Sequence, residues 1–207
     1  MFETPNAVQL RISIDGVKPE AWRRLIVPAE WTLSQLHLVI QAAFNWWNYH
    51  LHEFRIGGLR FGDLEIENEF ADDDSQRLLD HNEVRLKDFD RGAKRFLYVY
   101  DFGDEWRHSV AFEKWLFLTP SPRAATCIAG GGARPPEDVG GVPGYERFLE
   151  IIADRKHPEH RDTLRWCGGH FDPTWFDLVV VDKDVRAALK PNVRRRLHQP
   201  RPTKNTK

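Results

Sequence analysis

Apolar and polar side chains alternate near the start of the chain. In VQLRISID (8–15) four apolar side chains fall on one face, and the polar ones between them fall on the other. Because successive side chains of a strand point to opposite faces, this pattern predicts a half-buried strand. AWRRLIVP (21–28) predicts a second strand that Pro28 ends, after a turn at Asp15-Gly16.

The pattern then changes to steps of three and four residues, which are typical of a helix with one core-facing side. TLSQLHLVIQAAFNWW (32–47) predicts this helix. Thr32 and Gln35 are spaced as a capping box, in which each side chain accepts a hydrogen bond from the other residue's backbone N–H. The apolar stripe consists of Leu33, Leu36, Ile40, Phe44 and Trp47.

Two hairpins follow from turn chemistry and renewed alternation. HEFRIGGLRFG (52–62) predicts two short strands joined at Gly57-Gly58. KRFLYVYDFGDEWRHSVAFEKW (94–115) predicts two longer strands, with a turn at 102–105. Polar side chains gather around this second turn, which makes it a candidate for function.

Other segments carry weaker signals. Residues 63–74 hold seven acids and no base, which favours a solvated loop. VRLKDFD (84–90) fits either a short helix or an extended piece. Residues 119–144 hold six glycines and five prolines without periodicity, which predicts a long ordered or semi-ordered loop.

The C-terminal part is predicted to be helical. GYERFLEIIAD (144–154) has an apolar stripe, Pro158 and Gly168 bound a second helix, and a last helix is expected from Asp182 to Lys190. We therefore expect an α+β fold: a mostly antiparallel sheet built from hairpins, one helix of the N-terminal half packed on it, C-terminal helices and a long Gly/Pro-rich loop. Residues 1–190 are predicted to form one domain.

Composition narrows the function classes. Hydrophobic residues make up 41% of the chain, and eight tryptophans and thirteen phenylalanines predict an aromatic-rich core. The net charge of −1 gives no overall field that favours nucleic acid or a membrane. The start MFETPNAVQL lacks the basic and apolar regions of a signal peptide, and no apolar run is long enough to span a bilayer. Two distant cysteines suit a reducing compartment, so a cytoplasmic location is expected.

The last segment, 191–207, carries six bases and no acid, which predicts a disordered tail. Contact with nucleic acid is one role for such a tail, but a solubilising terminus is the favoured interpretation. The arginines available for such contact are Arg194, Arg195, Arg196 and Arg201.

Several longer motifs occur in a fixed order: KPEAWRRLIVP, LHLVIQAAFNWWNYHLHEFRIGG, FLYVYDFGDEWRHSV, CIAGGGARPPEDVGGVPGYERFLE and HPEHRDTLRWCGGHFDPTWFDL. Over residues 7–189 the chain resembles the plasmid pRiA4b ORF-3-like family, bacterial proteins often found on plasmids and near transposable elements. The resemblance implies an α+β domain with an antiparallel sheet and helices, and it implies no established activity. Val139 stands where the family often has cysteine, which weakens any metal or redox role that pairs this position with Cys127.

Some members of this family carry the label of a transposon resolvase. A serine recombinase needs an activated serine with several supporting arginines. No serine of this chain lies in such a context: Ser13 is within an alternating strand and Ser34 is in the first turn of a helix. Resolvase chemistry is therefore not expected.

A metal-dependent hydrolase, nuclease-like and using a divalent metal, is the main enzymatic hypothesis. His50 and His52 flank Leu51, and residues i and i+2 of a strand share a face, so both imidazoles are placed to bind one ion. His108 is a third histidine candidate, with acids of the 101–105 turn as further ligands. HxH alone is a weak signal and acids are common in turns, so we favour an exposed rim or satisfied hydrogen bonds, with no cofactor. Glu137 and Asp138 are interpreted as turn caps.

The leading hypothesis is a non-enzymatic binding or accessory module, associated with plasmids or mobile elements, that recognises an unknown macromolecule or a small polar ligand. Aromatic side chains beside charged ones are typical of recognition surfaces. The predicted rim consists of His50, His52, Glu53, Tyr100, Asp101, Asp104, Glu105, Trp106, Arg107 and His108.

Overall fold

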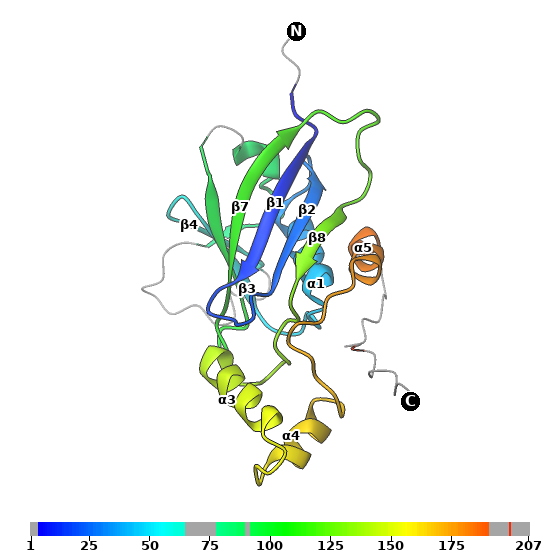
Figure 1. Cartoon of the computed structure of the whole chain (residues 1–207). Helices are drawn as coiled ribbons and strands as arrows, with labels where there is room; N and C mark the ends of the chain where they lie inside the picture. Colours follow the sequence, from blue (N-terminus) through cyan, green and yellow to red (C-terminus); the bar gives the residue numbers. More distant parts are fainter. Residues whose placement is uncertain (1–3, 65–77, 90–91, 191–198, 200–207) are drawn as a thin grey trace.

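The computed structural model describes residues 4–64, 78–89, 92–190 and 199. Eight strands form one sheet in the order β5-β4-β3-β6-β7-β1-β2-β8 (Figure 1). All neighbouring pairs are antiparallel except β4 and β5. The strands are β1 (Ala7–Ile14), β2 (Trp22–Pro28), β3 (His52–Ile56), β4 (Leu59–Gly62), β5 (Leu78–Asp80), β6 (Arg95–Tyr100), β7 (Trp106–Leu116) and β8 (Thr126–Gly131).

The alternation of β1 predicts its burial correctly. Leu10 and Ile12 are fully buried, while Gln9 and Arg11, which alternate with them, are partly exposed. β1 lies between β2 and β7, so its apolar face is at the centre of the core. The first strand of the chain is thus a central strand of the finished sheet.

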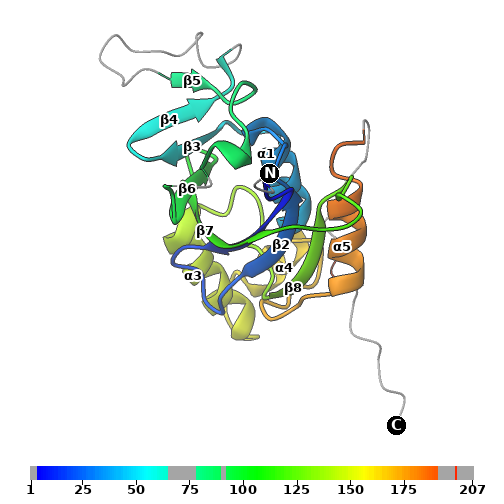
Figure 2. The same ribbon diagram turned by 90° about the horizontal axis from the view of Figure 1, so that it is seen from above.

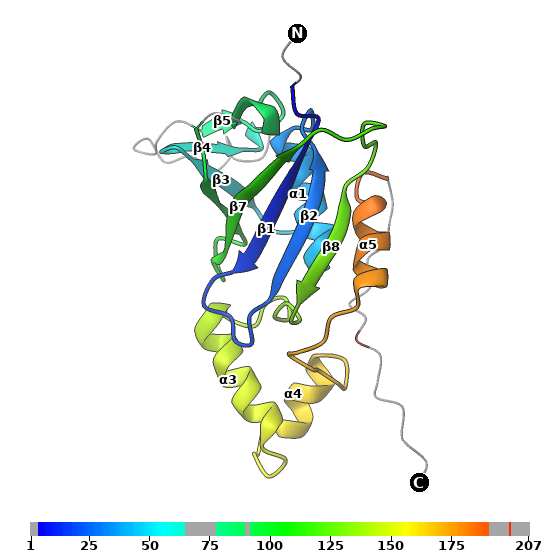
Figure 3. The ribbon, with the colours of Figure 1, turned by 45° about the horizontal axis from the view of Figure 1, so that its top comes forward.

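Helix α1 (Leu33–Phe44) packs against one face of the sheet, behind β1 and β2 in Figure 3. The capping box is confirmed: Gln35 N–H donates to the Thr32 hydroxyl, and Thr32 N–H donates to the Gln35 side chain. The helix is shorter than the predicted 32–47. It ends at Phe44 because Asn45 takes a left-handed conformation (φ 61°), a common way to stop a helix.

Both predicted hairpins are present. β3 and β4 turn at Gly57-Gly58, and β6 and β7 pair from Tyr100–Trp106 to Arg95–Ala111. The ambiguous segment 84–90 contains a short 3₁₀ helix, η1 (Leu86–Phe89).

The prediction that 119–144 is one irregular loop is wrong in part. The segment contains β8, an edge strand of the sheet, and the first turn of α3 (Gly141–Ala153). β8 pairs with β2 on one side, and on its other side Cys127 N–H donates to the Asp182 carboxylate of α5 (Leu178–Arg186) at 2.8 Å. The glycines of this strand conceal its alternation in the sequence.

The C-terminal helices complete the α+β fold. α3 and α4 (His160–Trp166) lie beyond one end of the strands, and α5 runs beside β8 (Figures 2 and 3). α5 begins four residues before the predicted Asp182, because the Asp177 side chain accepts hydrogen bonds from the backbone N–H groups of Val179 and Val180. Within the described residues, no helix is long and apolar enough to cross a membrane.

Two predicted segments fall largely or wholly outside the described residues. These are the acidic loop, of which the structure describes Asp63 and Leu64, and the basic tail with Arg194, Arg195, Arg196 and Arg201.

Candidate functional site

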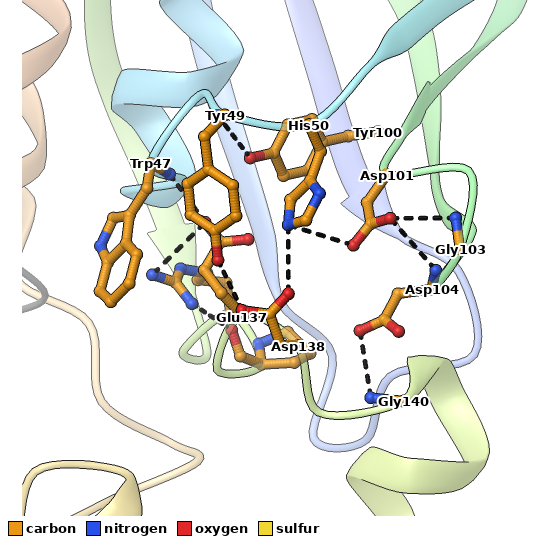
Figure 4. Close-up of polar contacts among 12 residues, drawn as sticks. Trp47, Tyr49, His50, Tyr100, Asp101, Gly103, Asp104, Glu137, Asp138 and Gly140 are labelled. Carbon is orange, nitrogen blue, oxygen red and sulfur yellow. Dashed lines mark hydrogen bonds and ion pairs between the residues drawn. The ribbon is translucent and has the colours of Figure 1, made fainter.

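Three segments that are far apart in the sequence meet at one end of the β6–β7 hairpin (Figure 4). They are the connection between α1 and β3 (45–51), the hairpin turn (101–105) and the loop that precedes α3 (132–140). Asp101 N–H donates to the Leu51 carbonyl at 2.9 Å, which fixes the turn to the connection. The Gly/Pro-rich loop therefore takes part in the site.

The backbone of these segments is unusual. Asn48, Asp101 and Asp138 all have left-handed conformations, with φ between 56° and 60°. Asn and Asp tolerate this region better than other non-glycine residues, because their short side chains bond locally to the backbone. Such conformations are enriched at functional sites, where the surrounding structure holds them in place.

The loop approaches the hairpin turn very closely at Gly141. A Cβ atom at this position would lie 2.7 Å from the Asp104 carbonyl oxygen, so only glycine fits. The neighbouring Gly140 N–H donates to the Asp104 carboxylate at 3.1 Å. These contacts set the position of Asp138, two residues earlier, relative to the turn.

The imidazole of His50 faces two carboxylates. Its Nε2 atom lies 3.4 Å from Asp101 Oδ2 and 3.3 Å from Asp138 Oδ1. The nitrogen is buried and makes no hydrogen bond of good geometry with either oxygen. Among the described residues, this is the one group of three or more His, Cys, Asp or Glu side chains whose ligand atoms lie within 4.8 Å of one another.

Both carboxylates are oriented by other donors. Asp101 Oδ1 accepts from the N–H groups of Gly103 (3.0 Å) and Asp104 (3.3 Å). Asp138 Oδ2 accepts from the Tyr49 hydroxyl at 2.7 Å. Each carboxylate thus has one oxygen held by the protein and one directed at His50, as Figure 4 shows.

A buried pair anchors the loop to the end of α1. Arg134 lies over the Trp46 ring and donates to the Asn45 carbonyl, which complements the negative end of the helix dipole. Glu137 accepts from Trp47 N–H at 2.7 Å. Burial raises the pKa of Glu137, and the charge of Arg134 opposes this rise. Glu137 therefore accepts a hydrogen bond from a backbone N–H, as the sequence predicted. The donor is Trp47, 90 positions earlier in the sequence, and not a residue of the same turn.

A cavity of about 400 Å³ opens beside His50. A second group of histidines lies in its wall: His37 of α1, His52 of β3 and His81 after β5. His52 stacks on His37, with ring centroids 3.5 Å apart, and its Nε2 lies 3.2 Å from His81 Nδ1. Burial lowers the pKa of both His52 and His81, and the neighbouring histidines lower that of His52 further.

The structure separates the predicted HxH pair. His50 faces the carboxylates of Asp101 and Asp138, whereas Nε2 of His52 faces His81. The two imidazoles do not converge on one point, because His50 precedes β3 and does not share its alternation.

Several residues of the predicted rim lie in the core. His108 is fully buried: its Nδ1 donates to the Trp106 carbonyl and its Nε2 accepts from the Trp46 indole. Burial lowers the pKa of His108 to about 4. Trp106 and Tyr100 are also fully buried. These side chains stabilise the fold and do not form a surface.

The charged members of the rim have mixed positions. Glu53 is buried and ion-paired to Arg55 and Arg60. Glu105 and Arg107 are exposed and pair with each other.

Sequence reasoning did not identify His37 or His81 as site residues, and it interpreted Asp138 only as a turn cap. The position of Asp138 depends on a loop without periodicity, so no local pattern identifies it as a partner of His50.

Comparisons with known proteins agree with this architecture. The family model described as "Plasmid pRiA4b ORF-3-like protein" matches residues 6–180. The uncharacterized protein y4hQ of Sinorhizobium fredii (strain NBRC 101917 / NGR234) is 41% identical over 181 residues, which cover 87% of this chain and 91% of the relative. The crystal structure of a protein of unknown function, MM3350 from Methanosarcina mazei Go1, matches with a TM-score of 0.73 and 37% identity, over 88% of this chain and 99% of that chain.

Proposed function

The chain belongs to the plasmid pRiA4b ORF-3-like family, and from the geometry of its site we propose that it binds one divalent metal ion through His50, Asp101 and Asp138 and uses this ion to hydrolyse a polar substrate. One observation carries the proposal: the imidazole nitrogen and two carboxylate oxygens converge on a common point.

The distances fit an ion better than hydrogen bonds. Separations of 3.3 and 3.4 Å exceed the usual range for an N–H···O bond. Nitrogen and oxygen ligands at 2.0–2.2 Å from a tetrahedral zinc ion are about 3.4 Å apart. The arrangement therefore has the spacing of a coordination shell.

The surrounding contacts also support a metal site. Ligating carboxylates are normally held by further hydrogen bonds, which fix their orientation. The Tyr49 hydroxyl does this for Asp138, and two backbone N–H groups do it for Asp101.

Three protein ligands leave coordination positions for water and substrate, which is typical of catalytic rather than structural metal sites. A bound ion supplies Lewis acidity and a water of lowered pKa. His50, but neither carboxylate, lines the neighbouring cavity, which offers a place for the substrate on the His50 side of the site.

A second candidate is the non-enzymatic binding module. Trp47 and Tyr49 flank the same site and are about half exposed (48% and 50%), and Phe102 of the hairpin turn is 42% exposed. Exposed aromatics beside charged groups support recognition of a macromolecule or a small polar ligand.

The first test is metal content. Purified full-length protein is loaded with zinc or manganese, desalted and analysed for metal, beside Asp138→Asn and the matched control Asp162→Asn, an exposed acid of α4. We expect Asp138→Asn to bind one equivalent less than the unsubstituted chain and the control to bind the same amount. Equal metal content in all three folded proteins would exclude the proposed site and leave the binding module.

The catalytic part has its own test. The metal-loaded chain is assayed against chromogenic ester, amide and phosphodiester substrates, with Asp138→Asn as the comparison. Activity that needs metal and is lost in Asp138→Asn supports hydrolysis. Metal binding with no turnover of any substrate class contradicts it and favours a metal-bound recognition site.

A further inference from the structure

The histidines in the cavity wall form a group that the site above does not use. His52 Nε2 and His81 Nδ1 face each other at 3.2 Å. Two imidazole nitrogens at 2.0–2.1 Å from a tetrahedral ion are roughly 3.3 Å apart. The pair is therefore already spaced as two ligands of one ion.

The orientation of His52 is fixed by a neighbour. His37 stacks on it with an interplanar angle of 11°. His37 in turn contacts the Tyr98 hydroxyl through Nδ1 and the Asn48 side chain through Nε2. Since the Asn48 oxygen only accepts, His37 carries its proton on Nε2, and Tyr98 donates to Nδ1. This network keeps the His52 ring from turning away from His81.

His81 is fixed through its backbone. Its N–H donates to the Gly62 carbonyl of β4 at 3.1 Å, and its carbonyl accepts from Ser34 N–H of α1 at 3.2 Å. The histidine pair thus connects the sheet to the helix. Ligands held from several elements are the usual basis of a preformed metal site.

The space around the pair suits a hydrated ion. His52, His81 and Asp63 all line the cavity of about 400 Å³. The negative charge of Asp63, in the same cavity wall, acts on His81. Imidazole nitrogens with water are a donor set suited to zinc and related transition metals.

We propose that His52 and His81 form a second transition-metal site in this cavity, with water completing the coordination. The site shares no ligand with His50, Asp101 and Asp138, so it does not rest on the proposed function. Its ligands are those of a zinc-type ion, and oxygen-preferring ions such as Mg²⁺ are not expected to bind there.

The test is zinc stoichiometry measured by isothermal titration on the full chain. The variants are His81→Ala, Asp138→Asn and the matched control His170→Ala, a histidine after α4. We expect two equivalents for the unsubstituted chain and the control, and one equivalent for each of the other two variants.

The outcomes separate the two sites. Zinc binding that His81→Ala leaves unchanged would overturn the histidine site, whatever Asp138→Asn does. Loss in His81→Ala but not in Asp138→Asn would support the histidine site and remove the proposed catalytic one.

A second measurement avoids the risk that His81→Ala does not fold. Long-range ¹H–¹⁵N spectra of the unsubstituted protein report each imidazole nitrogen during zinc titration. We expect the His52 Nε2 and His81 Nδ1 signals to shift, and those of buried His108 to stay. Unchanged His52 and His81 signals at saturating zinc would mean that the pair shares a simple N–H···N hydrogen bond.

Discussion

His108 belongs to strand β7 and His50 lies beside the turn of the β6–β7 hairpin, yet their ring nitrogens have different surroundings. In His108 one nitrogen donates to a carbonyl and the other accepts from an indole, and the ring is fully buried. In His50 the Nε2 atom has two carboxylates close by and bonds to neither with good geometry. Both ring nitrogens of His108 thus have hydrogen-bond partners, whereas Nε2 of His50 faces two carboxylate oxygens without a hydrogen bond of good geometry to either.

This difference shows what marks a functional histidine in this molecule. In His108 both ring nitrogens are bonded to groups of the core, and its role is packing. The candidate ligand is the ring whose neighbours are oriented by other groups, as Asp101 and Asp138 are. If this distinction holds, substitutions in the core and at the site should affect stability and metal binding independently.

The largest effect is expected from adjacent tryptophans in the two regions. Trp46→Ala removes a fully buried ring that contacts Tyr100, Trp106 and His108, which should cost about 3–5 kcal/mol of unfolding free energy. Trp47→Ala removes a ring that is 48% exposed and should cost less than about 1 kcal/mol. Urea unfolding measures the free energy of unfolding of both variants. A similar loss of stability in the two variants would contradict the assignment of Trp46 to the core and Trp47 to the site.

The next effect concerns pH. The pKa of His108 is about 4 in the folded protein and 6.5 when unperturbed, so the unfolded chain binds a proton that the folded chain refuses. The free energy of unfolding should therefore fall by about 3 kcal/mol as the pH drops from 6.5 to 4. Urea unfolding at several pH values checks this, and His108→Gln should show a shallower decline. An equal slope in the variant would mean that other groups dominate acid unfolding.

A smaller effect is expected from metal. Zinc at 100 times its dissociation constant should stabilise the folded chain by about 2.7 kcal/mol for each site filled. Asp138→Asn should lose one such increment and be almost unchanged without zinc, because its carboxylate is mostly exposed (62%). Thermal unfolding with and without zinc measures this. A variant that is destabilised equally in both conditions would show that Asp138 is structural.

The smallest effect is expected from Tyr49→Phe. It removes the hydroxyl that donates to Asp138 and keeps the ring, so stability should change by about 0.5 kcal/mol or less. Metal affinity should fall about tenfold, since a group that orients a ligand is lost. Zinc titration of the variant tests this, and unchanged affinity would mean that Asp138 needs no such support.

Local patterns predicted much of the fold. The alternation of 8–15, the capping box at Thr32 and the turn at Gly57-Gly58 each act through neighbouring residues, and each is confirmed. The start of α5 was predicted four residues too late, and β8 was predicted to be part of a loop. The Asp177 side chain caps α5 and so starts the helix earlier than its apolar pattern indicates. Pairing with β2 makes β8 a strand although its sequence shows no clear alternation.

The site was predictable only in part. The sequence placed His50 and Asp101 in one predicted rim, because aromatic side chains stand beside charged ones in both segments. It did not indicate Asp138, which is 88 positions from His50 in the sequence. Asp138 is held near His50 because Gly141 packs closely on Asp104 and Glu137 accepts a hydrogen bond from Trp47 N–H. Nor did the sequence separate His108, whose two ring nitrogens are bonded to the core, from His50, since both lie in stretches rich in aromatic residues.

The contact between β8 and α5 has a consequence for how copies of the chain meet. A sheet edge with unpaired N–H groups invites strand addition from another molecule and so promotes aggregation. At this edge the Asp182 carboxylate accepts a hydrogen bond from the Cys127 N–H, and α5 runs alongside the strand (Figure 3). The opposite edge is β5, a strand of three residues. Both margins of the sheet are thus poor templates for intermolecular pairing, which favours resistance to amyloid-type assembly.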